Sequence, residues 1–157
     1  MANFTFNIAK GRVVEFYNRV ENNDPTNSAI ILVVLAATDT EANLQDIDDL
    51  AAVLAATPNE VGAAWGASNG RKTLESVQLA AFHAPDDTNN RYAVQVPQVT
   101  WTAVAAGNNA VGLLVCYDSD TTAGTDSNII PLTHHDFAVT TDGNDVILNV
   151  GDFFRAS

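Results

Sequence analysis

Apolar and polar positions follow strand periods through most of residues 94–157, which predicts a sheet. Residues 94–103 nearly alternate around Pro97, and a proline in such a run indicates an edge position or a bulge. Residues 110–117 form an almost unbroken apolar run, which is typical of a strand buried on both faces. The C-terminal half therefore reads as the centre of the fold.

Further short strands are expected over residues 128–132, 137–140 and 146–150. The last two flank Asp142-Gly143-Asn144, which is a hairpin signal. Four or five strands joined by short polar turns can close a sandwich or a barrel. The predicted fold class is mainly β, sandwich-like or barrel-like, with one or two short α-helices.

The N-terminal half adds one strand and the helices. Residues 28–37 predict a second fully buried strand, and residues 48–56 a short helix with acids at its start. Residues 13–21 repeat apolar side chains at helical spacing, although a two-stranded ribbon is an alternative because Val, Phe and Tyr also favour strands. Residues 71–79 have sheet-like character, and residues 85–90 an acidic loop composition.

No repeat or linker divides the 157 residues, so we expect a single domain. Phe4, Phe6 and Ile8 alternate with polar residues, which predicts an opening strand or, over residues 1–12, an N-terminal arm. The longest apolar run, residues 29–37, is too short to cross a bilayer. We therefore expect no membrane partner.

The formal net charge of -12 argues against partners that are themselves negatively charged. Nucleic acid and anionic lipid surfaces bind cationic proteins, so neither is an expected partner. The single cysteine, Cys116, lies in the most apolar strand and reads as a small buried hydrophobe. One cysteine cannot form an intramolecular disulfide, which fits assembly in a reducing cytosol.

Two groups of side chains could carry metal chemistry. His134 and His135 are adjacent; in a strand they would point to opposite faces, and in a loop they would need further ligands. We interpret them as turn or surface histidines. Asp118, Asp120 and Asp126 lie in one loop, but they lack the spacing of an EF-hand, so a Ca²⁺ site there stays an open alternative.

No nucleophile elbow, phosphate-binding loop or metalloprotease motif is present in the sequence. The two tryptophans, Trp65 and Trp101, could form a platform for a sugar, but a role in the core or in a subunit contact is favoured. We therefore expect neither an enzyme nor a cofactor.

The two ends of the chain supply candidate partner contacts. Lys10 and Arg12 are two of only seven basic residues and would steer an acidic surface towards this protein; an ordinary solvated face is the alternative. Aromatic residues near both termini would supply the anchoring. The candidate contact set is Phe4, Phe6, Lys10, Arg12, Phe153, Phe154 and Arg155, and the two C-terminal phenylalanines pack either on the domain's own core or on a neighbouring subunit.

Three stretches resemble small structural proteins of tailed phages and prophages: MANFTFNIAKGRVVEFYNRVENNDPTNSAIILVVL, DDTNNRYAVQVPQVTWTA, and LLVCYDSDTTAGTDSNIIPLTHHDFAVTTDG with the final FFRAS. The resemblance implies a head decoration (cement) protein that binds the major capsid protein on the outside of the mature head. It further implies a homo-oligomer, with a trimer favoured, that is assembled in the bacterial host cytoplasm and located on the virion. It transfers no functional residue.

Three alternatives stay open beside this reading. The first is a virion protein of the tail, neck or fibre, and the second is a sugar-binding or Ca²⁺-binding module. A metal hydrolase built on His134 and His135 comes last.

Overall fold

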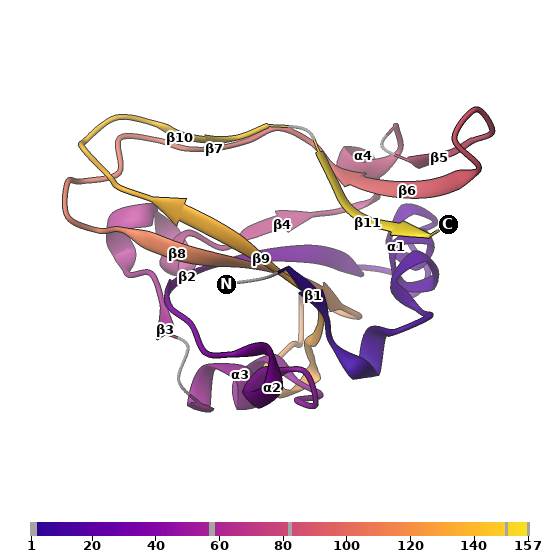
Figure 1. Ribbon diagram of the computed structural model, residues 1–157, viewed down its shortest axis with the longest axis horizontal. Helices are drawn as coiled ribbons and strands as arrows, with labels where there is room; N and C mark the ends of the chain where they lie inside the picture. The colour runs from indigo at the N-terminus through magenta and orange to yellow at the C-terminus, as the bar shows by residue number, and fades with distance from the viewer. Residues whose placement is uncertain (1–2, 57–58, 82, 150, 157) are drawn as a thin grey trace.

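The protein is described here by a computed structural model that covers residues 3–56, 59–81, 83–149 and 151–156. The mainly β class predicted from the sequence is confirmed: strands take up 37% of the chain and helices 25%, and the sheets are antiparallel. Within the described residues, only two helices reach seven residues. Figure 1 shows the strands in two layers, with helices at the outer face and at one end.

The central sheet has the strand order β1-β9-β8-β2-β3, and β4 also pairs with β2. Its long members are β2 (Ala29–Ala37), β8 (Ala110–Asp118) and β9 (Ile130–Val139). Short strands flank them: β1 (Phe4–Thr5), β3 (Asn59–Glu60) and β4 (Lys72–Leu74). β2 and β8 are buried along almost their whole length, which confirms both strands predicted as buried on two faces.

The second layer consists of two small sheets that lie over one face of the central sheet (Figure 1). One has the order β11-β6-β5, from β5 (His83–Asp86), β6 (Arg91–Val96) and β11 (Gly151–Ala156). The other pairs β7 (Val99–Trp101) with β10 (Val146–Leu148). Pro97 lies between β6 and β7, outside both strands, so it separates two strands where an edge position or a bulge within one run was expected.

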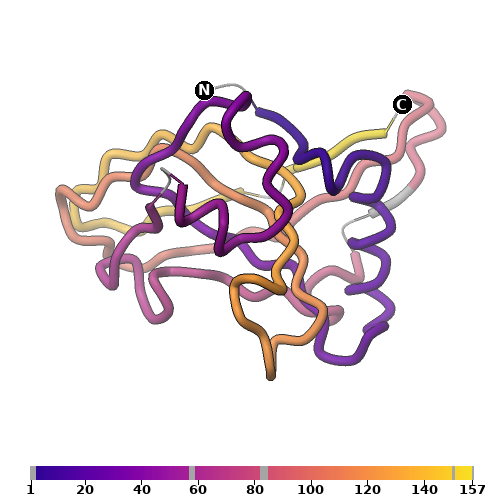
Figure 2. The backbone as a smooth tube through the Cα atoms, turned by 90° about the horizontal axis from the view of Figure 1, so that it is seen from below, coloured from indigo at the N-terminus to yellow at the C-terminus, as the bar shows by residue number. Residues whose placement is uncertain are grey.

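Each face of the central sheet buries its own hydrophobic core. The first core lies between the two β layers and includes Trp101, Leu32 and Val115. The second core lies on the opposite face, where α2 (Glu41–Leu44) and α3 (Leu50–Ala56) cover the sheet with Leu44, Leu50 and Val53. In Figure 2 these two helices lie apart from α1.

Helix α1 (Val13–Glu21) has the bounds that its apolar spacing predicts. Val13, Phe16, Tyr17 and Val20 are buried on one face of α1, so the alternative of a two-stranded ribbon is wrong. The Tyr17 hydroxyl donates to the Gln95 carbonyl oxygen over 3.0 Å and joins the helix to β6. The other short helices are η1 (Asn7–Ala9), η2 (Ala63–Trp65), η3 (Ala67–Gly70), α4 (Ser76–Leu79) and η4 (Asp126–Asn128).

Three local predictions are wrong. β9 runs unbroken through residues 130–139, where two strands separated by a turn were expected, because it pairs with β8 along that length. The predicted hairpin at residues 142–144 is only a turn: β10 continues away from β9 and pairs with β7, where the Asp145 carboxylate accepts from the Ala103 amide over 2.8 Å.

The third concerns the middle of the chain, where sheet character was expected throughout residues 71–79. The sheet character expected over residues 71–79 ends at Leu74, where the Gln78 side chain accepts from the Glu75 amide over 2.9 Å and starts α4. The acidic loop expected over residues 85–90 is the turn of the β5–β6 hairpin, which begins at residue 83. No described helix is long and apolar enough to cross a membrane.

Candidate functional site

The N-terminal residues of the predicted contact set fall into buried and exposed members. Phe4 is 8% exposed, Phe6 is fully buried, and both belong to the second core. β1 pairs Phe4 with His134, and the Phe6 amide donates to the Leu132 carbonyl oxygen over 3.0 Å. Of the two alternatives for this segment, an opening strand or an arm, the structure shows a strand: Phe4 and Thr5 pair with β9, and Phe4 and Phe6 pack in the second core.

Lys10 and Arg12 are exposed where the chain enters α1. Arg12 pairs with Glu15 at 3.1 Å, and Arg19 pairs with the same carboxylate at 3.0 Å. The hydrogen bond from Arg12 lowers the pKa of Glu15. Lys10 makes no ion pair with any described residue, so its ammonium group is available to a partner.

The C-terminal phenylalanines pack on the protein's own core. Phe153 is 8% exposed, and its ring centroid lies 6.0 Å from that of Tyr17. Phe154 is half-buried and also packs against this core. The register of β11 against β6 shifts between Asp152 and Phe154, and such a bulge allows neighbouring side chains to depart from strict alternation.

Exposed cations therefore remain as the accessible part of the predicted contact set. Arg155 is exposed and pairs with Asp152 on its own strand. Figures 1 and 2 both place β11 beside α1, at the end of the molecule where the chain enters that helix. The structure thus brings the elements that carry Lys10, Arg12 and Arg155 to one end of an otherwise acidic protein.

His134 and His135 lie in the middle of β9, so the prediction of turn or surface histidines is wrong. As expected for neighbours in a strand, they point to opposite faces: His134 stacks on Phe4, and the His135 Nε2 atom lies 2.8 Å from the Thr133 hydroxyl. Burial lowers the pKa of both imidazoles. This arrangement cannot direct the two rings at one metal ion.

The aspartates of the loop after β8 are engaged separately. Asp118 accepts from the Asp120 amide over 3.0 Å, and Asp120 accepts from the Thr122 hydroxyl over 2.6 Å. Asp126 faces Arg71 instead. Among the described residues, no group of three or more His, Cys, Asp or Glu side chains is arranged to hold a metal ion.

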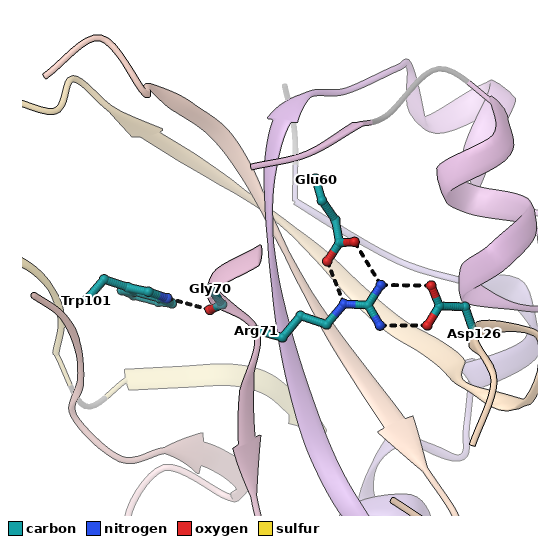
Figure 3. A network of polar contacts seen from close by, with 5 residues as sticks. All are labelled: Glu60, Gly70, Arg71, Trp101 and Asp126. Carbon is teal, nitrogen blue, oxygen red and sulfur yellow. Dashed lines mark hydrogen bonds and ion pairs between the residues drawn. The ribbon is translucent and has the colours of Figure 1, made fainter. Parts of the chain in front are cut away.

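Arg71 forms the most developed polar network of the molecule, which we call the Arg71 clamp (Figure 3). Its guanidinium contacts both carboxylate oxygens of Glu60 at 2.5 and 2.8 Å and both of Asp126 at 2.6 and 2.8 Å. Only 19% of the Arg71 side chain is exposed. The hydrogen bonds to Asp126 and Glu60 raise the pKa of Arg71, and the Arg71 contact lowers the pKa of Asp126.

The clamp ties three segments that are distant in the sequence, and the sequence gives no signal for it. Glu60 ends β3, the strand that comes after α3 in the chain. Arg71 immediately precedes β4, and Asp126 is the first residue of η4, after the loop that follows β8. A hollow of about 460 Å³ lies beside the clamp, with Asp118, Thr73 and Thr121 in its wall. Asp126 therefore already has a cationic partner in the Arg71 guanidinium.

The tryptophans are structural. Trp101 is fully buried and Trp65 is 3% exposed, and their rings meet edge to face at 5.6 Å. Trp101 donates its indole N–H to the Gly70 carbonyl oxygen over 2.6 Å, and Trp65 donates to that of Asn108 over 2.7 Å. Neither ring offers an open face on which a sugar could stack.

Comparisons of this chain with protein-family models, with curated proteins and with solved structures find no match.

Proposed function

We propose that the protein is a structural, many-copy component of a phage virion, with decoration of the outside of the mature head as its role and the major capsid protein as its partner. The observation that carries the proposal is the group of exposed cations Lys10, Arg12 and Arg155, on neighbouring elements of a protein with net charge -12. The resemblance of residues 1–35, 86–103 and 113–143 to tailed-phage structural proteins supplies the partner.

A localised group of cations on an acidic protein favours one orientation during encounter with an acidic surface. The buried Phe4, Phe6 and Phe153 hold the elements that present these cations, so their contribution to binding is indirect. A trimer would engage three such ends at once, and linked weak contacts reinforce one another without any single strong contact.

The test is co-sedimentation of purified protein with parent capsids that lack it. Replacing Lys10 and Arg12 by Ala should reduce the bound fraction several-fold at low salt, and raising the ionic strength should reduce wild-type binding in the same direction. Deleting residues 1–12 is unsuitable as a test, because it also removes Phe4 and Phe6 from the second core.

A matched control changes the net charge elsewhere. Ala42→Glu on α2 combined with Ala55→Glu on α3 adds two negative charges at exposed positions of the helix-covered face, the same change in net charge, and should leave binding nearly intact. Equal loss in both variants would indicate a general charge effect and would overturn the docking end proposed here. Copy number per particle separates head decoration, with hundreds of copies, from a tail, neck or fibre role with roughly a dozen or fewer.

A further inference from the structure

His134 is a fully buried imidazole that holds the N-terminal strand against the central sheet. Its ring stacks on that of Phe4 with centroids 5.1 Å apart and planes inclined by 6°. Its Nε2 atom lies 3.0 Å from the hydroxyl oxygen of Thr38, which follows β2. One side chain thus joins β1, β9 and the chain after β2.

Gly112 of β8 makes room for this ring. A Cβ atom at Gly112 would lie 3.0 Å from the His134 Nε2 atom and 3.4 Å from a methyl group of Leu35. Residues with side chains at that position would displace the imidazole. The site is therefore shaped around a ring at position 134.

The Nδ1 atom of His134 is buried and has no hydrogen-bond partner among the described residues. A neutral ring that donates from Nε2 to Thr38 leaves only an unpaired acceptor at Nδ1, which an apolar environment tolerates better than an unpaired donor. Protonation would place an N–H and a positive charge at Nδ1, opposite no acceptor.

The surroundings of His134 oppose that charge. Burial is the largest cause that lowers its pKa, to about 4; His135 and the chain's amino-terminal charge act in the same direction, and Asp136 opposes them. Phe4 and Leu114 pack around the ring without charge. Asp39, next to Thr38, is already hydrogen-bonded to the Thr40 amide and the Asn43 side chain.

We propose that His134 is an acid-sensitive latch: protonation of its buried ring releases residues 3–9 from β9 while the β2–β8–β9 part of the sheet stays formed. The release is local because β1 is only two residues long, whereas β8 and β9 pair over most of their length. The released segment leads directly into Lys10 and Arg12, so the latch would control how these cations are presented. The proposal does not depend on the capsid role.

The direction with pH follows from the lowered pKa. A histidine whose pKa is lower in the folded state loses stability as pH falls from 6.5 towards about 4, because the released state then binds the proton more readily. The ratio of released to latched protein should rise by up to about tenfold for each pH unit within that interval.

Amide hydrogen exchange measured by NMR tests the latch in the full chain. Protection factors, corrected for the intrinsic pH dependence of exchange, should fall for the amides of Phe4 and Phe6, which face β9, between pH 6.5 and 4. Those of Leu114 and Val115 in β8 should stay high. Uniform loss across the sheet, or none at β1, would overturn the proposal.

Two histidine variants of equal net charge separate the latch from general acid effects. His134→Gln cannot be protonated and should abolish the pH dependence at β1, whereas His135→Gln should retain it. Should His134→Gln fail to fold, titration of the wild-type His134 ring by NMR decides the matter: a midpoint near 6.5 would contradict the latch, and one near 4 would support it.

Discussion

A single guanidinium does at Arg71 what a metal ion does in many loop-rich proteins. Its planar donors match two carboxylates at once, and the pair of two-point contacts fixes the relative position of Glu60 and Asp126. The same network engages Asp126, so the aspartate-rich loop after β8 has one carboxylate fewer to offer a Ca²⁺ ion.

Replacing Arg71 by Ala should destabilise the protein by about 2 kcal/mol, since Glu60 and Asp126 would be left facing each other without a counter-charge. This value lies below that of a fully buried pair because 35% of the Asp126 side chain is exposed to solvent. Urea unfolding at neutral pH measures it. Arg19→Ala, which breaks a pair with 47% and 44% exposed side chains, is the control and should change stability by less than about 0.5 kcal/mol.

The same pair sets a pH dependence of stability. The pKa of Asp126 is lowered by Arg71, so its contribution is present above the ordinary carboxyl pKa and is lost as pH falls through the folded-state value. The difference in free energy of unfolding between the wild type and Arg71→Ala should therefore become smaller as the pH is lowered. An unchanged difference would show that the ion pair contributes little.

At the scale of elements, the two chain ends stabilise the fold from opposite faces of the central sheet. β1 is the edge strand next to β9, and its Phe4 packs in the second core. β11 packs on the first core beside α1. Tyr17 links α1 to both β6 and Phe153. Residues 4–9 and 151–156 therefore both contribute to the packing of the domain.

Phe153→Ala should reduce stability by about 3 kcal/mol, because it opens a cavity in the first core next to Tyr17. Phe154→Ala removes a half-buried ring from the same strand and should reduce stability by about 1 kcal/mol. Thermal or urea unfolding of the two variants gives the comparison. Equal losses would mean that the bulge in β11 does not separate the environments of the two rings.

Sequence periodicity predicts those helices and strands whose own residue pattern identifies them, without knowledge of the strands they pair with. β2 and β8 are recognisable because a strand buried on both faces is apolar throughout, and α1 because its buried side chains repeat at helical spacing. The pairing of β10 with β7 depends on Ala103 and Asp145, which meet only in the fold. No local pattern encodes that choice.

The candidate site illustrates the same division. Lys10, Arg12 and Arg155 can be expected at the surface because basic side chains are usually exposed, although Arg71 departs from that rule. The burial of His134 cannot be read from the sequence, because it depends on the absence of a side chain at Gly112 and on the position of Thr38. The Arg71 clamp is equally hidden, since its partners lie 11 and 55 residues away.

At the scale of the whole molecule, charge opposes self-association. With a net charge of -12, copies repel one another at neutral pH unless specific contacts oppose the repulsion, which would suit the many-copy role that we propose. The computed isoelectric point lies near 4.2, so this repulsion vanishes in mild acid.

Light scattering at low salt should therefore show reversible association that increases as pH approaches about 4.2 and recedes when neutral pH is restored. His134→Gln and His135→Gln have the same charge at neutral pH, so a difference between them would report on the released N-terminal segment. Scattering that is constant across this pH range would contradict the role assigned to net charge.

The position of β2 has a consequence for synthesis on the ribosome. This strand pairs along seven successive positions with β8, about eighty residues later in the chain, and of the strands that the structure describes only short β3 and β4 pair with it sooner. During translation, β2 therefore stays unpaired with β8, and its Ile, Leu and Val side chains stay exposed, until the second half of the chain has been made. Such exposed apolar segments favour misassembly and chaperone binding.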